Sequence, residues 1–69
     1  MEISYNKLWK LLIENKMKKK DLQERTGISE YTIKKLNHCE PVSMDVMMKL
    51  CKLFHCDIGD LMEIIEEEN

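Results

Sequence analysis

The segment from Lys18 to Leu36, KKKDLQERTGISEYTIKKL, constrains the fold of this chain more than any other stretch. Its apolar residues are spaced for one buried face on each of two short helices, at Leu22, Ile28, Ile33 and Leu36. Gly27 lies between the two halves, and glycine suits the left-handed conformation that ends many helices. The segment therefore predicts two short helices joined by a tight turn.

The boundaries of these two helices follow from their charged and hydroxyl residues. The first helix should cover about residues 19–25, with Asp21 and Glu24 placed where carboxylates complement the helix dipole. Ser29 is a suitable N-cap for the second helix, which should run to about Asn37. Ile28, directly before that cap, is expected to pack against the turn.

Three further helices are expected around this pair, in about residues 5–16, 43–54 and 58–66. Leu8, Leu11, Leu12 and Asn15 follow the helical spacing in the first of them, and Ser43 is an N-cap for the second. Leu61, Met62, Ile64 and Ile65 would supply the apolar surface of the last. No alternation typical of strands is apparent, so the prediction is a compact all-α domain of five helices over residues 1–69. Its acidic end, residues 66–69, is expected to fray because negative charge is unfavourable at a helix C-terminus.

Helix 5–16 carries a second apolar pair at Trp9 and Ile13, beside its first stripe. A helix that is apolar over more than half its circumference needs a second cover, either a C-terminal element or another subunit. Trp9 and Ile13, together with Met62 and Ile65, are therefore candidate surfaces for a homodimer.

The charges of the chain are divided unevenly along its length. Residues 1–40 carry nine Lys/Arg and six Asp/Glu, a net charge of +3, whereas residues 41–69 carry two Lys and seven Asp/Glu, a net charge of −5. Because a local field rather than the net charge attracts a polyanion, the overall charge of −2 does not exclude nucleic acid as a partner. The acidic half would then face away from it.

Several classes of protein are not expected from this composition. The longest apolar runs are three residues, far below the length of a membrane span, so we expect no membrane association and a cytoplasmic location. Three cysteines without framework spacing indicate reduced thiols. No nucleophile–base set, phosphate loop or paired-acid site is present, so an enzyme is not expected, and neither is a cofactor.

The quoted motif, the SMDVMMKLCKLF segment from Ser43 and the CDIGDL segment from Cys56 together resemble the phage-repressor and Cro-type helix-turn-helix domains of the Xre family. The resemblance covers about residues 5–65, with the helix-turn-helix motif at about 19–37. It implies a lambda-repressor-like fold and a transcriptional regulator that binds double-stranded DNA, with the helix at about 29–37 in the major groove.

The resemblance also implies roles for individual residues. Ser29, Glu30, Tyr31 and Lys35 match recognition-helix positions that meet bases and backbone, and Lys19 matches a residue that touches a phosphate. Thr32, Lys34 and Lys18 would add phosphate contacts, and Ser43 would bring a backbone N–H group to a phosphate. The predicted DNA-binding residues are thus Lys18, Lys19, Ser29, Glu30, Tyr31, Thr32, Lys34, Lys35 and Ser43. The chain departs from the family at Lys18, Gln23, Thr26 and Cys39, where a helix-capping Ser or Thr, a small residue, an aliphatic residue and a glycine are usual.

Two other functions remain open at this point. Helix-turn-helix folds also serve as protein-interaction modules, and the acidic C-terminal half would suit an antitoxin-like partner of a small basic protein. The second alternative is a thiol or metal sensor, with Cys39 as its reactive thiol. The spacing of the cysteines and histidines lacks a zinc-site pattern, so no metal site is expected.

Overall fold

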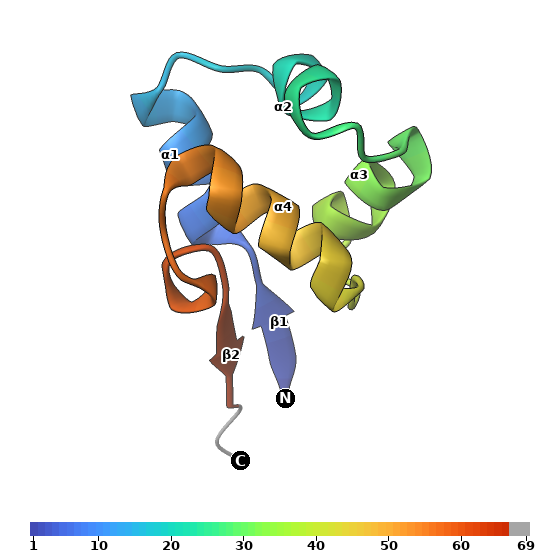
Figure 1. Ribbon diagram of the computed structural model, residues 1–69. Helices are drawn as coiled ribbons and strands as arrows, with labels where there is room; N and C mark the ends of the chain where they lie inside the picture. The colour runs from blue at the N-terminus through green and yellow to red at the C-terminus, as the bar shows by residue number, and fades with distance from the viewer. Residues whose placement is uncertain (67–69) are drawn as a thin grey trace.

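The computed structural model describes residues 1–66 as four α-helices with a short 3-10 turn and a small sheet (Figure 1). The elements in chain order are β1 (Glu2–Ser4), α1 (Asn6–Glu14), α2 (Lys19–Thr26), α3 (Glu30–Asn37), α4 (Met44–Phe54), η1 (Ile58–Asp60) and β2 (Glu63–Ile65). The two strands project from the helical body and carry both ends of the described chain, which gives an elongated shape of 40 × 23 × 19 Å. No helix within residues 1–66 is long and apolar enough to cross a lipid bilayer.

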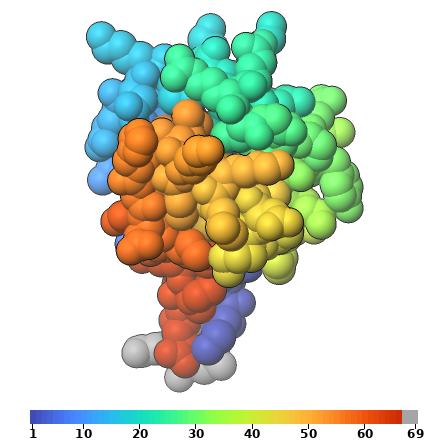
Figure 2. Space-filling view, viewed as in Figure 1, coloured from blue at the N-terminus to red at the C-terminus, as the bar shows by residue number. Residues whose placement is uncertain are grey.

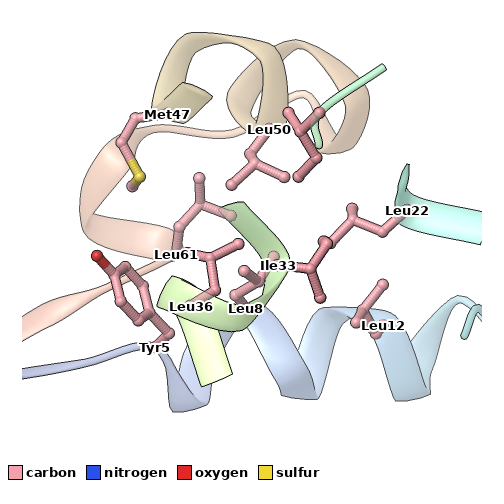
Figure 3. Close-up of a cluster of buried hydrophobic side chains, with 10 residues drawn as sticks. Tyr5, Leu8, Leu12, Leu22, Ile33, Leu36, Met47, Leu50 and Leu61 are labelled. Atoms are coloured by element: carbon pink, nitrogen blue, oxygen red, sulfur yellow. The ribbon is translucent and has the colours of Figure 1, made fainter. Parts of the chain in front are cut away.

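One core of apolar side chains joins all four helices (Figure 3). Its members are Tyr5, Leu8, Leu12, Leu22, Ile28, Ile33, Leu36, Met47, Leu50 and Leu61. The four residues that the motif predicted as core, Leu22, Ile28, Ile33 and Leu36, are all buried there. Because each helix contributes two or fewer fully buried residues, none of them can be stable alone, and the domain folds as a unit.

The ends of the central helices agree with the sequence prediction. Gly27 adopts a left-handed conformation with φ of 74° and ends α2, and its N–H group donates to the carbonyl of Gln23. The Ser29 hydroxyl accepts a hydrogen bond from the N–H group of Thr32, and the Ser43 hydroxyl accepts one from that of Val46. His55 ends α4 in the left-handed region, with φ of 53°. These bonds satisfy backbone groups that a helix end leaves unpaired.

The prediction of a fifth helix over residues 58–66 was wrong. That segment forms the single 3-10 turn η1 and then the strand β2, which pairs with β1 in antiparallel register, Glu2 opposite Ile65 and Ser4 opposite Glu63. The expectation that the chain holds no strand was therefore also wrong. The fraying expected at residues 66–69 falls outside the described residues except at Glu66, which is exposed and lies in neither helix nor strand.

The physical reason for this difference is a partner distant in sequence. Gly59 weakens any helix through this segment, and the acidic residues beyond it would oppose the dipole at its C-terminus. Ile64 and Ile65 are β-branched and favour an extended backbone when a pairing strand is present. That strand is contributed by residues 2–4, some 60 residues earlier in the chain.

Helix α1 also ends earlier than predicted, at Glu14 rather than Lys16. Lys16 is in the left-handed region with φ of 54°, and the N–H group of Met17 donates to the carbonyl of Leu12. The second apolar face of α1 is only partly covered, since Trp9 is half-buried while Ile13 is 75% exposed.

Candidate nucleic-acid interface

The outer face of α3 carries the residues predicted to meet DNA bases. Ile33 and Leu36 anchor the helix in the core, which leaves Glu30, Tyr31 and Lys34 exposed on the opposite side. Thr32 and Lys35 are half-buried at its flanks. A helix that buries one stripe this firmly holds its outer side chains in a fixed orientation relative to the domain, as recognition of base edges requires.

Tyr31 and Lys35 act as a pair on this face, although they belong to different turns. The Lys35 ammonium lies over the Tyr31 ring at 5.0 Å from its centroid, a cation–π contact between residues spaced i, i+4. The ring is 68% exposed, so the pair presents both an aromatic surface and a positive charge to solvent. Such a pair can contact a thymine methyl group with its ring and a guanine or phosphate oxygen with its ammonium.

Lys19 is held in place by two other helices. Its ammonium lies 4.6 Å from the centroid of the Trp9 ring on α1 and donates a hydrogen bond to the Asn37 side-chain oxygen at the end of α3. These contacts join the start of α2 to α1 and α3, and the Lys19 side chain remains exposed to solvent. Sequence reasoning missed Trp9 and Asn37, because neither periodicity nor charge indicates contacts between different helices.

Lys18 has a structural role as well as a charge. It is the N-cap residue of α2 in an extended conformation, and its backbone N–H group donates to Asp21 Oδ2 at 2.8 Å. The Asp21 carboxylate therefore makes one half of a capping box, and the other half is missing because the lysine side chain has no acceptor. The side chain of Lys18 is exposed and free to reach outward.

The hydroxyl groups of Ser29 and Ser43 are engaged within the protein. Each accepts from a backbone N–H group of its own helix, and Ser29 Oγ also lies 3.0 Å from Thr32 Oγ1. These residues therefore position α3 and α4 first, and a contact from either helix start to DNA would come through backbone N–H groups. In the described part of the chain, no hydrogen bond joins Ser43 to the other predicted DNA-binding residues.

The loop between α3 and α4 is tied to the N-terminal segment by Tyr5. Its ring is 2% exposed, and its hydroxyl donates to the carbonyl of Glu40 at 2.8 Å. Burial raises the pKa of the Tyr5 phenol, with a smaller contribution from Cys39, so the hydroxyl keeps its proton and remains a donor. Tyr5 was not predicted as a loop anchor, and its only sequence signal is an aromatic residue directly before α1.

The cysteines do not form a metal site in the part of the chain that the structure describes, where no group of three metal-binding side chains occurs. Cys39 is exposed with φ of 56°, which fits the observation that its loop position suits glycine. Cys51 and Cys56 are half-buried against the core. Burial raises the pKa of the Cys56 thiol, and Cys51 and Asp60 add to the shift, which disfavours the reactive thiolate.

Comparison with known proteins agrees with this geometry. The family model of the Cro/C1-type HTH DNA-binding domain matches residues 7–67. A solved structure described as the transcriptional regulator VanUg, Form II, is similar to this chain with a TM-score of 0.90 and 47% sequence identity, over 96% of this chain and 88% of that one. No curated protein matches. Since the family match spans most of the sequence, the chain belongs to the Cro/C1-type helix-turn-helix DNA-binding domains.

Proposed function

We propose that this DNA-binding transcriptional regulator reads one operator half-site by placing α3 in the major groove. The observation that carries the proposal is the bond between Lys19 and Asn37, which brings the cationic start of α2 beside the recognition helix. The shared core holds the base-reading helix and the phosphate-binding helix start in one unit. Such a unit fixes the register of the protein on the duplex, and base contacts then supply specificity.

Base contacts are assigned to the outer face of α3. Tyr31 and Lys35 meet base edges as a pair, and Glu30 accepts from cytosine N4 or adenine N6. Phosphates are contacted by the side chains of Thr32, Lys34, Lys18 and Lys19 and by backbone N–H groups beside Ser29 and Ser43. The protein acts by binding rather than by catalysis.

We infer that two copies bind together on a two-fold operator. One domain of this size meets a single half-site, and a dimer doubles the contacted sequence. The exposed Ile13 beside Trp9 on α1 and the exposed Ile65 on β2 would form the contact. Met62 was expected beside Ile65 on one helix, but it precedes β2 and packs partly against the core. Sedimentation with and without operator DNA tests this, and a monomer under both conditions at micromolar concentration would contradict it.

The function is tested by selecting bound sequences from a random duplex pool at near-physiological salt. A reproducible motif, expected as an inverted repeat, would support both sequence recognition and the dimer. A pool that stays random would contradict the proposal and favour a protein partner instead.

The recognition face is tested on the selected site with Lys35→Ala and a matched control, Lys10→Ala. Lys10 is an exposed lysine of α1, so both variants lose one positive charge. We expect Lys35→Ala to cost about 1–3 kcal/mol in operator binding and to relax base choice. Lys10→Ala should leave base choice unchanged. Equal effects of the two substitutions would show that α3 is not the reading surface.

A further inference from the structure

A second group of cations lies away from the recognition helix, in a pocket between the C-terminal ends of α2 and α4. The pocket has a volume of about 460 Å³ and is lined by Arg25, Thr26, Lys49, Lys52, Leu53 and His55. This set is called the basic pocket below. Figure 2 shows the surface of α2 directly above that of α4 on the face where these two ends meet. A pocket of this volume falls within the range that small ligands occupy.

The lining of the basic pocket is one-sided in charge. Arg25, Lys49 and Lys52 contribute basic side chains, His55 adds an imidazole, and no carboxylate is among the lining residues. Lys49 and Lys52 are three residues apart and so share one face of α4. Three positive charges that line one concavity repel one another. An anion bound between them would be attracted to all three and would offset this repulsion.

Stabilisation of helix ends does not account for the whole cluster. Arg25 and Lys52 lie in the last turns of α2 and α4, where cations complement the helix dipole. Lys49 lies outside the last turn of α4, so the dipole gives no reason for a third cation there. Thr26 lines the pocket, but its hydroxyl is already engaged, since it donates to the Leu22 carbonyl and accepts from the Ile28 N–H group.

The basic pocket is also distant from the phosphates that the operator would present. Arg25 follows Lys19 by six residues, which places it about 9 Å further along the axis of α2. Lys52 follows Ser43 by nine residues, or about 13 Å along α4. The DNA-facing residues therefore lie at the starts of these helices, and the basic pocket lies at their ends.

We propose that the basic pocket binds a small phosphate-bearing polyanion at a site separate from the DNA surface. The arginine fork and two lysines suit a doubly or more highly charged phosphate group, and Leu53 offers an apolar surface to the rest of the ligand. This site is independent of whether α3 reads DNA, since none of its residues belongs to the predicted DNA interface.

The test is a nuclear magnetic resonance titration of the full chain with inorganic pyrophosphate, without DNA, at ionic strength held constant with sodium chloride. We expect saturable shifts of the backbone amides around residues 25–27 and 49–56. Orthophosphate should produce the same pattern with weaker affinity because it carries less charge. Uniform shifts equal to those of the salt control, or shifts centred on Lys18, Lys19 and α3, would overturn the proposal.

A pair of charge-matched double variants completes the test. Lys49→Gln with Lys52→Gln should raise the dissociation constant for pyrophosphate at least tenfold, whereas Lys10→Gln with Lys20→Gln should leave it within twofold. All four lysines are exposed, so neither variant removes core packing. Equal affinity of both variants would overturn the proposal, and the wild-type titration decides it alone if a variant does not fold. Loss of operator recognition in the separate pool selection would leave this result unaffected.

Discussion

Substitution of Tyr5 by Phe removes one hydroxyl from the core and nothing else. That hydroxyl donates to the Glu40 carbonyl across 35 residues of sequence, and the ring around it is almost fully buried. A net contribution of about 0.5–1.5 kcal/mol is expected for one such bond. For a domain of this length each kcal/mol corresponds to roughly 4–8 °C in Tm. Tyr5→Phe should therefore lower the free energy of unfolding by about 1 kcal/mol without changing the core.

The measurement is urea unfolding at neutral pH, with Tyr31→Phe as the matched control. The Tyr31 ring is 68% exposed, and its hydroxyl makes no hydrogen bond within residues 1–66, so its loss should change stability by less than about 0.5 kcal/mol. The slope of free energy against urea should be the same in all three proteins. Equal stability of Tyr5→Phe and wild type would refute the assignment of Tyr5 as the anchor of the α3–α4 loop.

The pH dependence of this difference gives a second check. Because burial raises the pKa of the Tyr5 phenol, the folded state favours its protonated form. The stabilisation is fully present below about pH 10, the pKa of an unfolded tyrosine, and is lost as pH rises through the higher pKa of the folded protein. The advantage of wild type over Tyr5→Phe should therefore shrink above about pH 10. A constant difference across this range would contradict the shift.

Three other substitutions test separate parts of the structure. Lys19→Ala should reduce the slope of log affinity against log salt concentration in operator binding by about 0.9. The affinity ratio of wild type to variant should therefore fall about 3.5-fold between roughly 50 and 200 mM salt. An unchanged slope, measured by fluorescence anisotropy, would exclude the phosphate contact. Cys39→Gly should stabilise the protein by up to about 1 kcal/mol, because glycine adopts φ of 56° without steric cost, and a lower Tm would argue against strain at this position. Leu61→Ala should lower the free energy of unfolding by about 2–5 kcal/mol, since Leu61 is fully buried and its carbonyl accepts from the N–H group of Leu8. A decrease below about 1 kcal/mol would show that the segment after α4 is dispensable for folding.

The central helices could be predicted from the sequence because their signals are local. The apolar spacing of Leu22, Ile33 and Leu36 identifies the buried faces of α2 and α3, and Gly27 and Ser29 identify the turn between them. Each of these signals acts over a few residues, through helix periodicity or a single capping bond. The same spacing identifies the outer face of α3, because residues opposite a buried stripe must face solvent.

Tertiary structure alone decided the contacts between residues distant in sequence. Ile64 and Ile65 are compatible with a helix or a strand, and pairing with residues 2–4 selects the strand. The contact of Lys19 with Trp9, the hydrogen bond from Tyr5 to Glu40 and the pocket that Arg25 and Lys49 both line likewise depend on how separate elements pack. Local preferences of about 1 kcal/mol or less determine where helices begin and end, whereas burial of a shared core determines which of their ends meet.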